Sequence, residues 1–291
     1  MKIIHRLSII LLLSLPVALP VWADQVDRDW EQQITKKLAD KAVATEVLWL
    51  EADGEKFLAL YTGQSSQVAH GAVIILHAMG AHADWPQMIS PIRMALPEQG
   101  WSTLSIQLPL IAPQNQIEDY GLTLQRASDR IDAAVRYLRD RKFLNIVVIG
   151  HSFGAASTLA YLKKVGKQKV QALVAIGLQD YAFVKPSINV LELIEKSPVP
   201  ILDIYGSRDF KKVVDQAPDR RLAAKKGNNR NYTQFEIEGA DHYFNKMEDV
   251  LVKRIRGWLD KAAPGVSIMV KEDFDGNKDA KGETEDTLTE P

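Results

Sequence analysis

The chain has 291 residues, of which 46% are apolar and 25% are charged, with a formal net charge of −1 at pH 7. This balance is typical of a globular protein of one or two domains and gives no reason to expect nucleic acid as a partner. The chain contains no cysteine, which excludes disulfides, thiolate nucleophiles and cysteine-ligated metals.

The N-terminal segment has the pattern of a secretory signal. Lys2 and Arg6 precede a short apolar run that ends in Val21-Trp22-Ala23. We predict a signal peptide over residues 1–23, and therefore a periplasmic or secreted protein of a Gram-negative-type bacterium. Prolines interrupt the run, so no stable membrane span is expected after cleavage; an uncleaved anchor is the alternative.

The rest of the chain alternates apolar strands with helices. The expected strands are a hairpin over 47–61 and the segments 71–77, 102–108, 146–149, 170–177, 199–205 and 232–237. The expected helices are 24–42, 85–97, 121–141, one directly after Gly154, 217–226 and 243–261. This alternation predicts an α/β domain over residues 24–263, with a mostly parallel central sheet of about eight strands and helices on both faces.

Two further segments complete the predicted organisation. Residues 178–198, between two strands, have room for only one short helix, so no large lid domain is expected. Residues 264–291 become acidic and polar and are predicted to form a disordered tail.

One stretch predicts a nucleophile. The β-branched run 146–149 leads directly into Gly150-His151-Ser152-Phe153-Gly154, and an alanine-rich helical segment follows. This order fits the Gly-x-Ser-x-Gly elbow, in which glycines let the strand and helix approach while the serine occupies a strained turn. The alternative is a plain glycine-flanked turn with an exposed serine.

A serine nucleophile needs a base, and His242 is the predicted one. It follows the last predicted strand, and in a parallel sheet that loop lies at the same edge as Ser152. The alternative is a surface histidine that caps the final helix.

Three carboxylates could orient His242. Asp209 follows the penultimate strand, Asp180 follows the strand before it, and Asp241 adjoins the histidine in sequence. Asp209 is preferred because Gly206 permits a turn back over the strand end; its alternative is a surface ion pair with Arg208. The order Ser, Asp, His is that of the α/β-hydrolases.

The predicted oxyanion hole consists of two backbone N–H groups. Phe153 supplies one as the residue after the nucleophile, and Met79, in the loop after the strand 71–77, supplies the other. His77 and His82 flank this loop, but no third ligand stands at a helpful spacing, so neither a metal nor a cofactor is expected. His77 is expected to support the loop, and His151 to bond nearby backbone.

These motifs resemble those of the α/β-hydrolase superfamily over residues 71–261. The resemblance rests on His77-Ala78-Met79-Gly80, on the elbow, on Gly206-Ser207-Arg208-Asp209 and on Asp241-His242. Residues 77–86 and 100–109 further resemble a family of exported bacterial proteins of unassigned function. Ala78 stands where the superfamily usually has glycine, and a positive φ there would strain alanine.

The sequence thus predicts an exported, carboxylesterase-like serine hydrolase that acts on a small-molecule or acylated substrate through an acyl-enzyme. Ser152, His242 and Asp209 form its expected catalytic triad. An amidase or acyltransferase could use the same site, and a catalytically silent binding module of the cell envelope is an alternative of another class.

Overall fold

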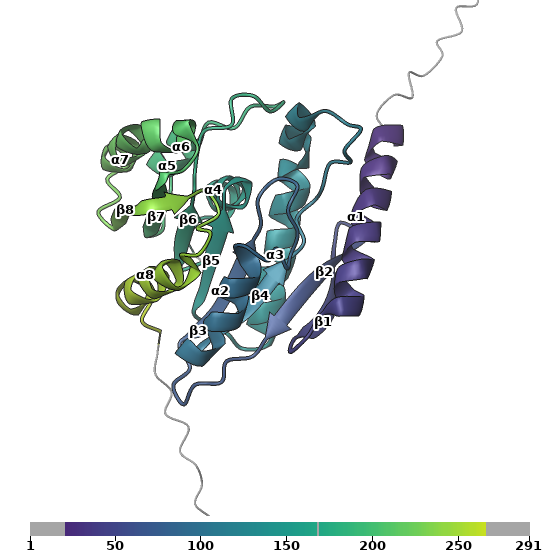
Figure 1. The fold of residues 1–291 in the computed structure, drawn as a ribbon, viewed down its shortest axis with the longest axis horizontal. Helices are drawn as coiled ribbons and strands as arrows, with labels where there is room; N and C mark the ends of the chain where they lie inside the picture. The colour runs from purple at the N-terminus through teal and green to yellow at the C-terminus, as the bar shows by residue number, and fades with distance from the viewer. Residues whose placement is uncertain (1–20, 168, 266–291) are drawn as a thin grey trace, which may run out of the picture.

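An eight-stranded sheet runs through the part of the chain that the computed structural model describes, residues 21–167 and 169–265 (Figure 1). The strands are β1 Glu46–Ala52, β2 Glu55–Thr62, β3 Gly71–Leu76, β4 Trp101–Ile106, β5 Ile146–His151, β6 Ala172–Ile176, β7 Ile201–Arg208 and β8 Tyr232–Asp241. Their order is β1-β2-β4-β3-β5-β6-β7-β8. The pairs β1–β2 and β2–β4 are antiparallel and all others are parallel, as the sequence predicted.

Helices cover both faces of this sheet. They are α1 Val21–Lys41, α2 Ile89–Ala95, α3 Leu124–Asp140, α4 Phe153–Val165, α5 Val190–Glu195, α6 Lys211–Asp215, α7 Ala217–Lys226 and α8 Glu248–Ala262, with 3₁₀ turns η1 Pro97–Gln99 and η2 Ile117–Thr123. Apolar residues of α3, α4, α5 and α7 belong to one core, and those of α2 and α8 to the other (Figure 1).

The two cores are built from alternate residues of the same strands. In β3, Ile74 and Leu76 face the first core, whereas Val73 and Ile75 face the second. Successive side chains of a strand point to opposite faces, so a strand covered on both sides must be apolar throughout. This requirement explains the continuous apolar runs that predicted a parallel sheet.

Two acidic side chains of helix α1 are buried in polar contacts with the rest of the domain. The Oδ1 atom of Asp27 accepts a hydrogen bond from the backbone of Ala112 at 2.7 Å, and Glu31 forms an ion pair of 2.7 Å with Arg130. The four-residue spacing of Val26, Trp30, Ile34 and Leu38 predicts an amphipathic helix with these residues on its apolar stripe. Asp27 and Glu31 are buried instead, while Trp30 is only half-buried. The prediction of an amphipathic helix is therefore correct in extent, but the most buried stripe lies one position away from the expected one.

Several helix boundaries differ from the predicted ones. The final helix begins at Glu248 rather than at residue 243, because Phe244 and Lys246 take positive φ angles that a helix cannot contain. The helix expected over 121–141 starts at Leu124, after the 3₁₀ turn η2, and the short helix α6 was not predicted.

The predicted signal peptide and tail fall largely outside the described residues. The structure describes nothing before Val21 or beyond Gly265, and α1 begins at Val21, two residues before the predicted cleavage position. None of the described helices is long and apolar enough to span a membrane.

Candidate active site

Ser152 lies in the sharp turn between β5 and α4, with φ 55° and ψ −114°. The flanking glycines make this turn possible. A Cβ atom on Gly150 would lie 2.5 Å from the backbone nitrogen of Ala155, and one on Gly154 would lie 2.7 Å from the carbonyl oxygen of Leu76. Both separations are too short for real atoms, so the local backbone has the geometry that the elbow pattern predicts.

His242 and Asp209 are hydrogen-bonded to each other. Nδ1 of His242 lies 2.6 Å from Oδ1 of Asp209, and both side chains are buried. The same carboxylate oxygen accepts the backbone N–H of Phe210 at 2.7 Å, while Oδ2 has no hydrogen-bond partner among the described residues. Since Nδ1 donates to the carboxylate, Nε2 is the ring nitrogen left to accept a proton.

The loop that carries His242 meets the elbow at the end of β6. The backbone N–H of Ser152 donates to the carbonyl of Ile176 at 2.7 Å. A Cβ atom on the next residue, Gly177, would lie 2.8 Å from Cε1 of His242, so the imidazole packs directly over this glycine. Nε2 of His151 also donates to the carbonyl of His242 at 3.0 Å, which ties the two loops together.

The hydroxyl of Ser152 bonds a residue that the sequence did not single out. Its Oγ atom lies 2.9 Å from Oη of Tyr181, and no hydrogen bond joins Ser152 to His242 in the described part of the chain. Burial raises the pKa of Tyr181, so its phenol stays protonated. Tyr181 lies just after β6 at the same sheet edge, and this position was the available signal, but in this loop the sequence pattern indicated only Asp180 as a candidate.

The two other candidate acids have different partners. Oδ1 of Asp180 accepts the backbone N–H of Val190 at 2.8 Å, at the start of α5. Oδ1 of Asp241 accepts the backbone N–H groups of Tyr243 and Asn245, at 3.0 and 3.1 Å. Both carboxylates thus fix local turns, and of the three candidates only Asp209 binds His242.

The two predicted oxyanion donors come from neighbouring segments. Gly154, at the start of α4, packs against the carbonyls of Leu76 and His77, which brings the loop after β3 to the elbow. The N–H groups of Phe153 and Met79 donate no hydrogen bond to any described residue. Neither group is therefore engaged by the described part of the chain, which is a condition for an oxyanion hole.

Ala78 is not strained in this loop. The positive φ belongs to Gly80, at 68°, whereas Ala78 has none. The N–H of Gly80 donates to Oη of Tyr120 at 2.8 Å, and the Tyr120 ring packs edge-on against Phe153 with 5.5 Å between centroids. The loop is therefore braced against the elbow without requiring glycine at position 78.

His77 supports the same loop as a neutral side chain. Its Nδ1 atom donates to the carbonyl of Ala78 at 2.7 Å, and Nε2 accepts the backbone N–H of Leu108 at 2.9 Å. Complete burial lowers the pKa of His77 to about 3. His82 accepts the N–H of Asp84 instead, and no metal-binding group of three His, Asp or Glu side chains exists among residues 21–167 and 169–265.

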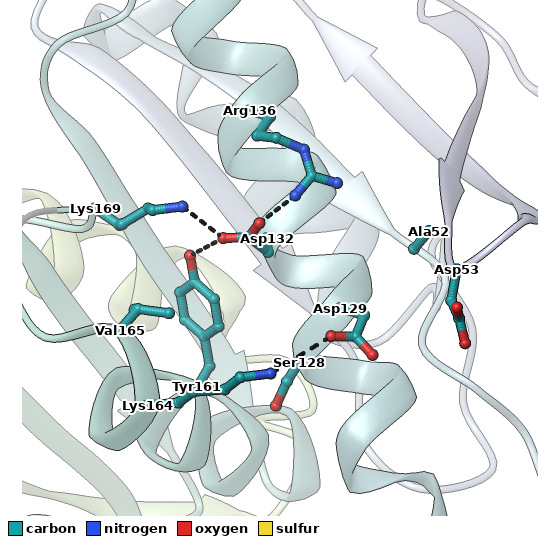
Figure 2. Close-up of a pocket in the computed structure, with 10 residues that line it drawn as sticks. All are labelled: Ala52, Asp53, Ser128, Asp129, Asp132, Arg136, Tyr161, Lys164, Val165 and Lys169. Carbon is teal, nitrogen blue, oxygen red and sulfur yellow. Dashed lines mark hydrogen bonds and ion pairs between the residues drawn. The ribbon is translucent and has the colours of Figure 1, made fainter.

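A separate charged groove of about 470 Å³ lies between α3, α4 and the β1–β2 turn (Figure 2). Asp132 forms its centre and points toward Lys169, Arg136 and the hydroxyl of Tyr161. None of the predicted site residues lines this groove. Its charges neutralise one another, so it has the character of a solvated ion-pair network.

The chain belongs to the family described as protein of unknown function DUF3530. The family matches residues 8–120 and 119–261, which include every candidate residue of the site. A comparison with curated proteins finds no match.

Many solved structures share the fold, and three of them have TM-scores between 0.59 and 0.62. Est1E from Butyrivibrio proteoclasticus, with ferulic acid bound, has a TM-score of 0.62 at 17% identity and covers 74% of this chain and 98% of its own. Dienelactone hydrolase from Anabaena variabilis has a TM-score of 0.61 at 18% identity, with coverages of 76% and 100%. A lidless α/β serine hydrolase from Xanthomonas campestris has a TM-score of 0.59 at 16% identity, with coverages of 77% and 98%.

These likenesses confirm the predicted α/β-hydrolase fold. Ligands of open α/β sheets bind outside the carboxyl ends of the strands. The elbow, the His242–Asp209 pair and the two free N–H groups all lie at that edge, so fold and local geometry indicate the same candidate site.

Proposed function

We propose that this protein is an exported serine hydrolase that cleaves carboxylic esters through an acyl-enzyme. The observation that carries the proposal is the His242–Asp209 hydrogen bond of 2.6 Å, with the imidazole over Gly177 beside the elbow that holds Ser152. A paired, correctly oriented imidazole next to a strained serine is the arrangement that serine hydrolysis requires.

Each residue has one step in the proposed reaction. Oγ of Ser152 attacks the ester carbonyl while Nε2 of His242 removes its proton, and Asp209 holds Nδ1 and stabilises the imidazolium. The N–H groups of Phe153 and Met79 bind the oxyanion. His242 then protonates the leaving alcohol, and water activated by the same imidazole hydrolyses the acyl-enzyme.

Ester substrates are proposed for two reasons. Similar structures are named as esterases, one of them with ferulic acid bound. In this chain, the ring of Phe210 stacks on His242 with 4.0 Å between centroids, and Phe183 is partly exposed beside Tyr181. Aromatic side chains beside the nucleophile suit an apolar or aromatic acyl group.

Hydrolysis of a series of p-nitrophenyl esters by acyl-chain length tests the proposal. Wild-type protein should release nitrophenol catalytically, and Ser152→Ala or His242→Ala should lower kcat by at least about 10³-fold. His70→Gln is a matched control, since His70 lies at the amino end of β3, and it should retain wild-type activity. Equal activity in wild type and Ser152→Ala would refute the proposal, and complete inactivity towards esters and amides would favour a silent binding module.

The proposal of export rests on the signal pattern before Asp24. N-terminal sequencing of protein recovered from a Gram-negative periplasm should find Asp24 as the first residue. An uncleaved chain in the membrane fraction would contradict it.

A further inference from the structure

The hydroxyl of Tyr181 makes the one hydrogen bond that the described chain offers to Ser152 Oγ, at 2.9 Å. Tyr181 is 1% exposed. Its backbone exchanges two hydrogen bonds of 3.1 Å with Ile188, and its ring packs edge-on against Phe153 with 5.5 Å between centroids. The phenol is thus held rigidly beside the atom that would attack the substrate.

Either hydroxyl can donate in this hydrogen bond, and the proposed chemistry favours donation by the phenol. Burial raises the pKa of Tyr181, so the phenol keeps its proton at all pH values at which the protein would work. Ser152 must give its own proton to Nε2 of His242 in order to attack. If the phenol donates to Oγ, the serine proton stays free for that transfer.

On the basis of the proposed serine chemistry, we propose that Tyr181 is a further catalytic residue, whose phenol donates a hydrogen bond to Ser152 Oγ and stabilises the negative charge on that oxygen. During acylation, an electron pair of Oγ forms the bond to the carbonyl carbon while the Oγ proton moves to His242, and the bond from that carbon to the alcohol oxygen then breaks as His242 protonates the leaving alcohol. During deacylation, water adds to the carbonyl carbon and gives a proton to His242, the carbon–Oγ bond breaks, and Oγ recovers a proton from His242. Tyr181 keeps its own proton throughout both steps.

This role differs from that of the oxyanion hole. In the proposed reaction, the N–H groups of Phe153 and Met79 donate hydrogen bonds to the carbonyl oxygen of the substrate, whereas the phenol of Tyr181 donates to Oγ of Ser152. A donor placed where charge develops accelerates the step in which the charge appears. Since Oγ carries developing charge in both acylation and deacylation, Tyr181 should affect both rates and affect substrate binding little.

Tyr181→Phe tests this role because it removes the hydroxyl and keeps the ring. We expect kcat for a p-nitrophenyl ester to fall about tenfold to a hundredfold, with KM changed by less than about threefold. The rate of fluorophosphonate labelling at Ser152 should fall by a similar factor. Tyr161→Phe is the matched control, since it removes a buried hydroxyl that bonds Asp132 at 3.0 Å, far from the elbow, and should leave both rates unchanged.

A second substitution distinguishes a catalytic role of the Tyr181 hydroxyl from an effect of this residue on packing. Tyr181→3-fluorotyrosine keeps the hydroxyl and makes it a stronger donor, so it should restore at least the wild-type kcat. Unchanged or increased activity in Tyr181→Phe would overturn the proposal, and so would a fluorotyrosine variant as slow as the Phe variant. Failure of the proposed function would look different, because the wild type and Ser152→Ala would then be equally inert.

Discussion

The rim at the carboxyl ends of β3, β5, β6, β7 and β8 differs from the charged groove between α3 and α4 in whether its polar groups have hydrogen-bond partners. At the rim, the N–H groups of Phe153 and Met79 and the Oδ2 atom of Asp209 have no partner among the described residues. In the groove, Asp132 accepts from Tyr161 and is ion-paired with Lys169 and Arg136 (Figure 2).

The groove is the more obvious hollow, yet the rim is the better candidate for chemistry. Native proteins pair nearly all their buried polar groups, so unpaired buried groups at one place call for an explanation. Backbone strain, as at Ser152, likewise concentrates at functional sites. In this chain, a strained serine and an unpaired buried carboxylate oxygen lie at the same rim, which favours the rim over the groove as the candidate site.

The largest expected difference between the rim and the groove is in how far a substitution lowers kcat. Asp209→Asn should lower kcat for p-nitrophenyl acetate by about 10³–10⁴-fold, because the amide favours the wrong tautomer of His242. Asp132→Asn makes the same chemical change in the groove and should leave kcat within about twofold. Comparable losses in the two variants, measured under the same conditions, would show that the rim is not the special region.

The sequence could predict most of this rim because its residues follow strands. Ser152 and Asp209 each stand in a loop directly after an apolar run, and the topology of a parallel sheet then brings them to one edge. Tyr181 also follows a strand, but its contact with Ser152 depends on how residues 178–198 fold back, which the position after the strand does not show. The buried carboxylates of α1 were missed for a similar reason: Asp27 is buried because the N–H of Ala112, far away in sequence, binds it.

Because backbone atoms pack closely at the rim, an added side-chain atom there should lower the free energy of unfolding. Gly154→Ala places a Cβ atom against two backbone carbonyls that cannot move easily, so it should destabilise the fold by about 2–3 kcal/mol. Gly257→Ala, in α8, meets no atom within 4 Å and should stabilise the fold by about 0.5–1 kcal/mol through helix propensity. Urea unfolding measures both, and a tolerated Gly154→Ala would contradict the tight packing of the elbow.

The folding stability should also depend on pH through groups that lie at the rim and not in the groove. Burial lowers the pKa of His77 to about 3, and burial together with the nearby His242 lowers the pKa of His151 to about 3. Below pH 6.5 the unfolded chain therefore binds protons that the folded chain does not, so stability is lost as pH falls from 6.5 towards 3. At pH 5 this loss is on the order of 2 kcal/mol for each histidine.

The charged groove should not contribute to the change in folding stability between pH 7 and pH 5. Although burial acts to raise the pKa of Asp132, hydrogen bonds from Lys169 and Tyr161 outweigh it and lower that pKa, so the carboxylate stays charged at pH 5. Urea unfolding at pH 7 and pH 5 should show the loss in wild type and a loss about half as large in His151→Gln. Equal stability at the two pH values would mean that these histidines are not buried as neutral groups.

The most direct test of the central claim is to look for the acyl-enzyme itself. Wild-type protein is mixed with p-nitrophenyl acetate, quenched in acid within the first turnover and digested for mass spectrometry. We predict the added mass of one acetyl group on the peptide that contains Ser152, accompanied by a burst of nitrophenol, and neither signal in Ser152→Ala. Turnover without any acyl adduct on that peptide, or an adduct on a different residue, would contradict the account.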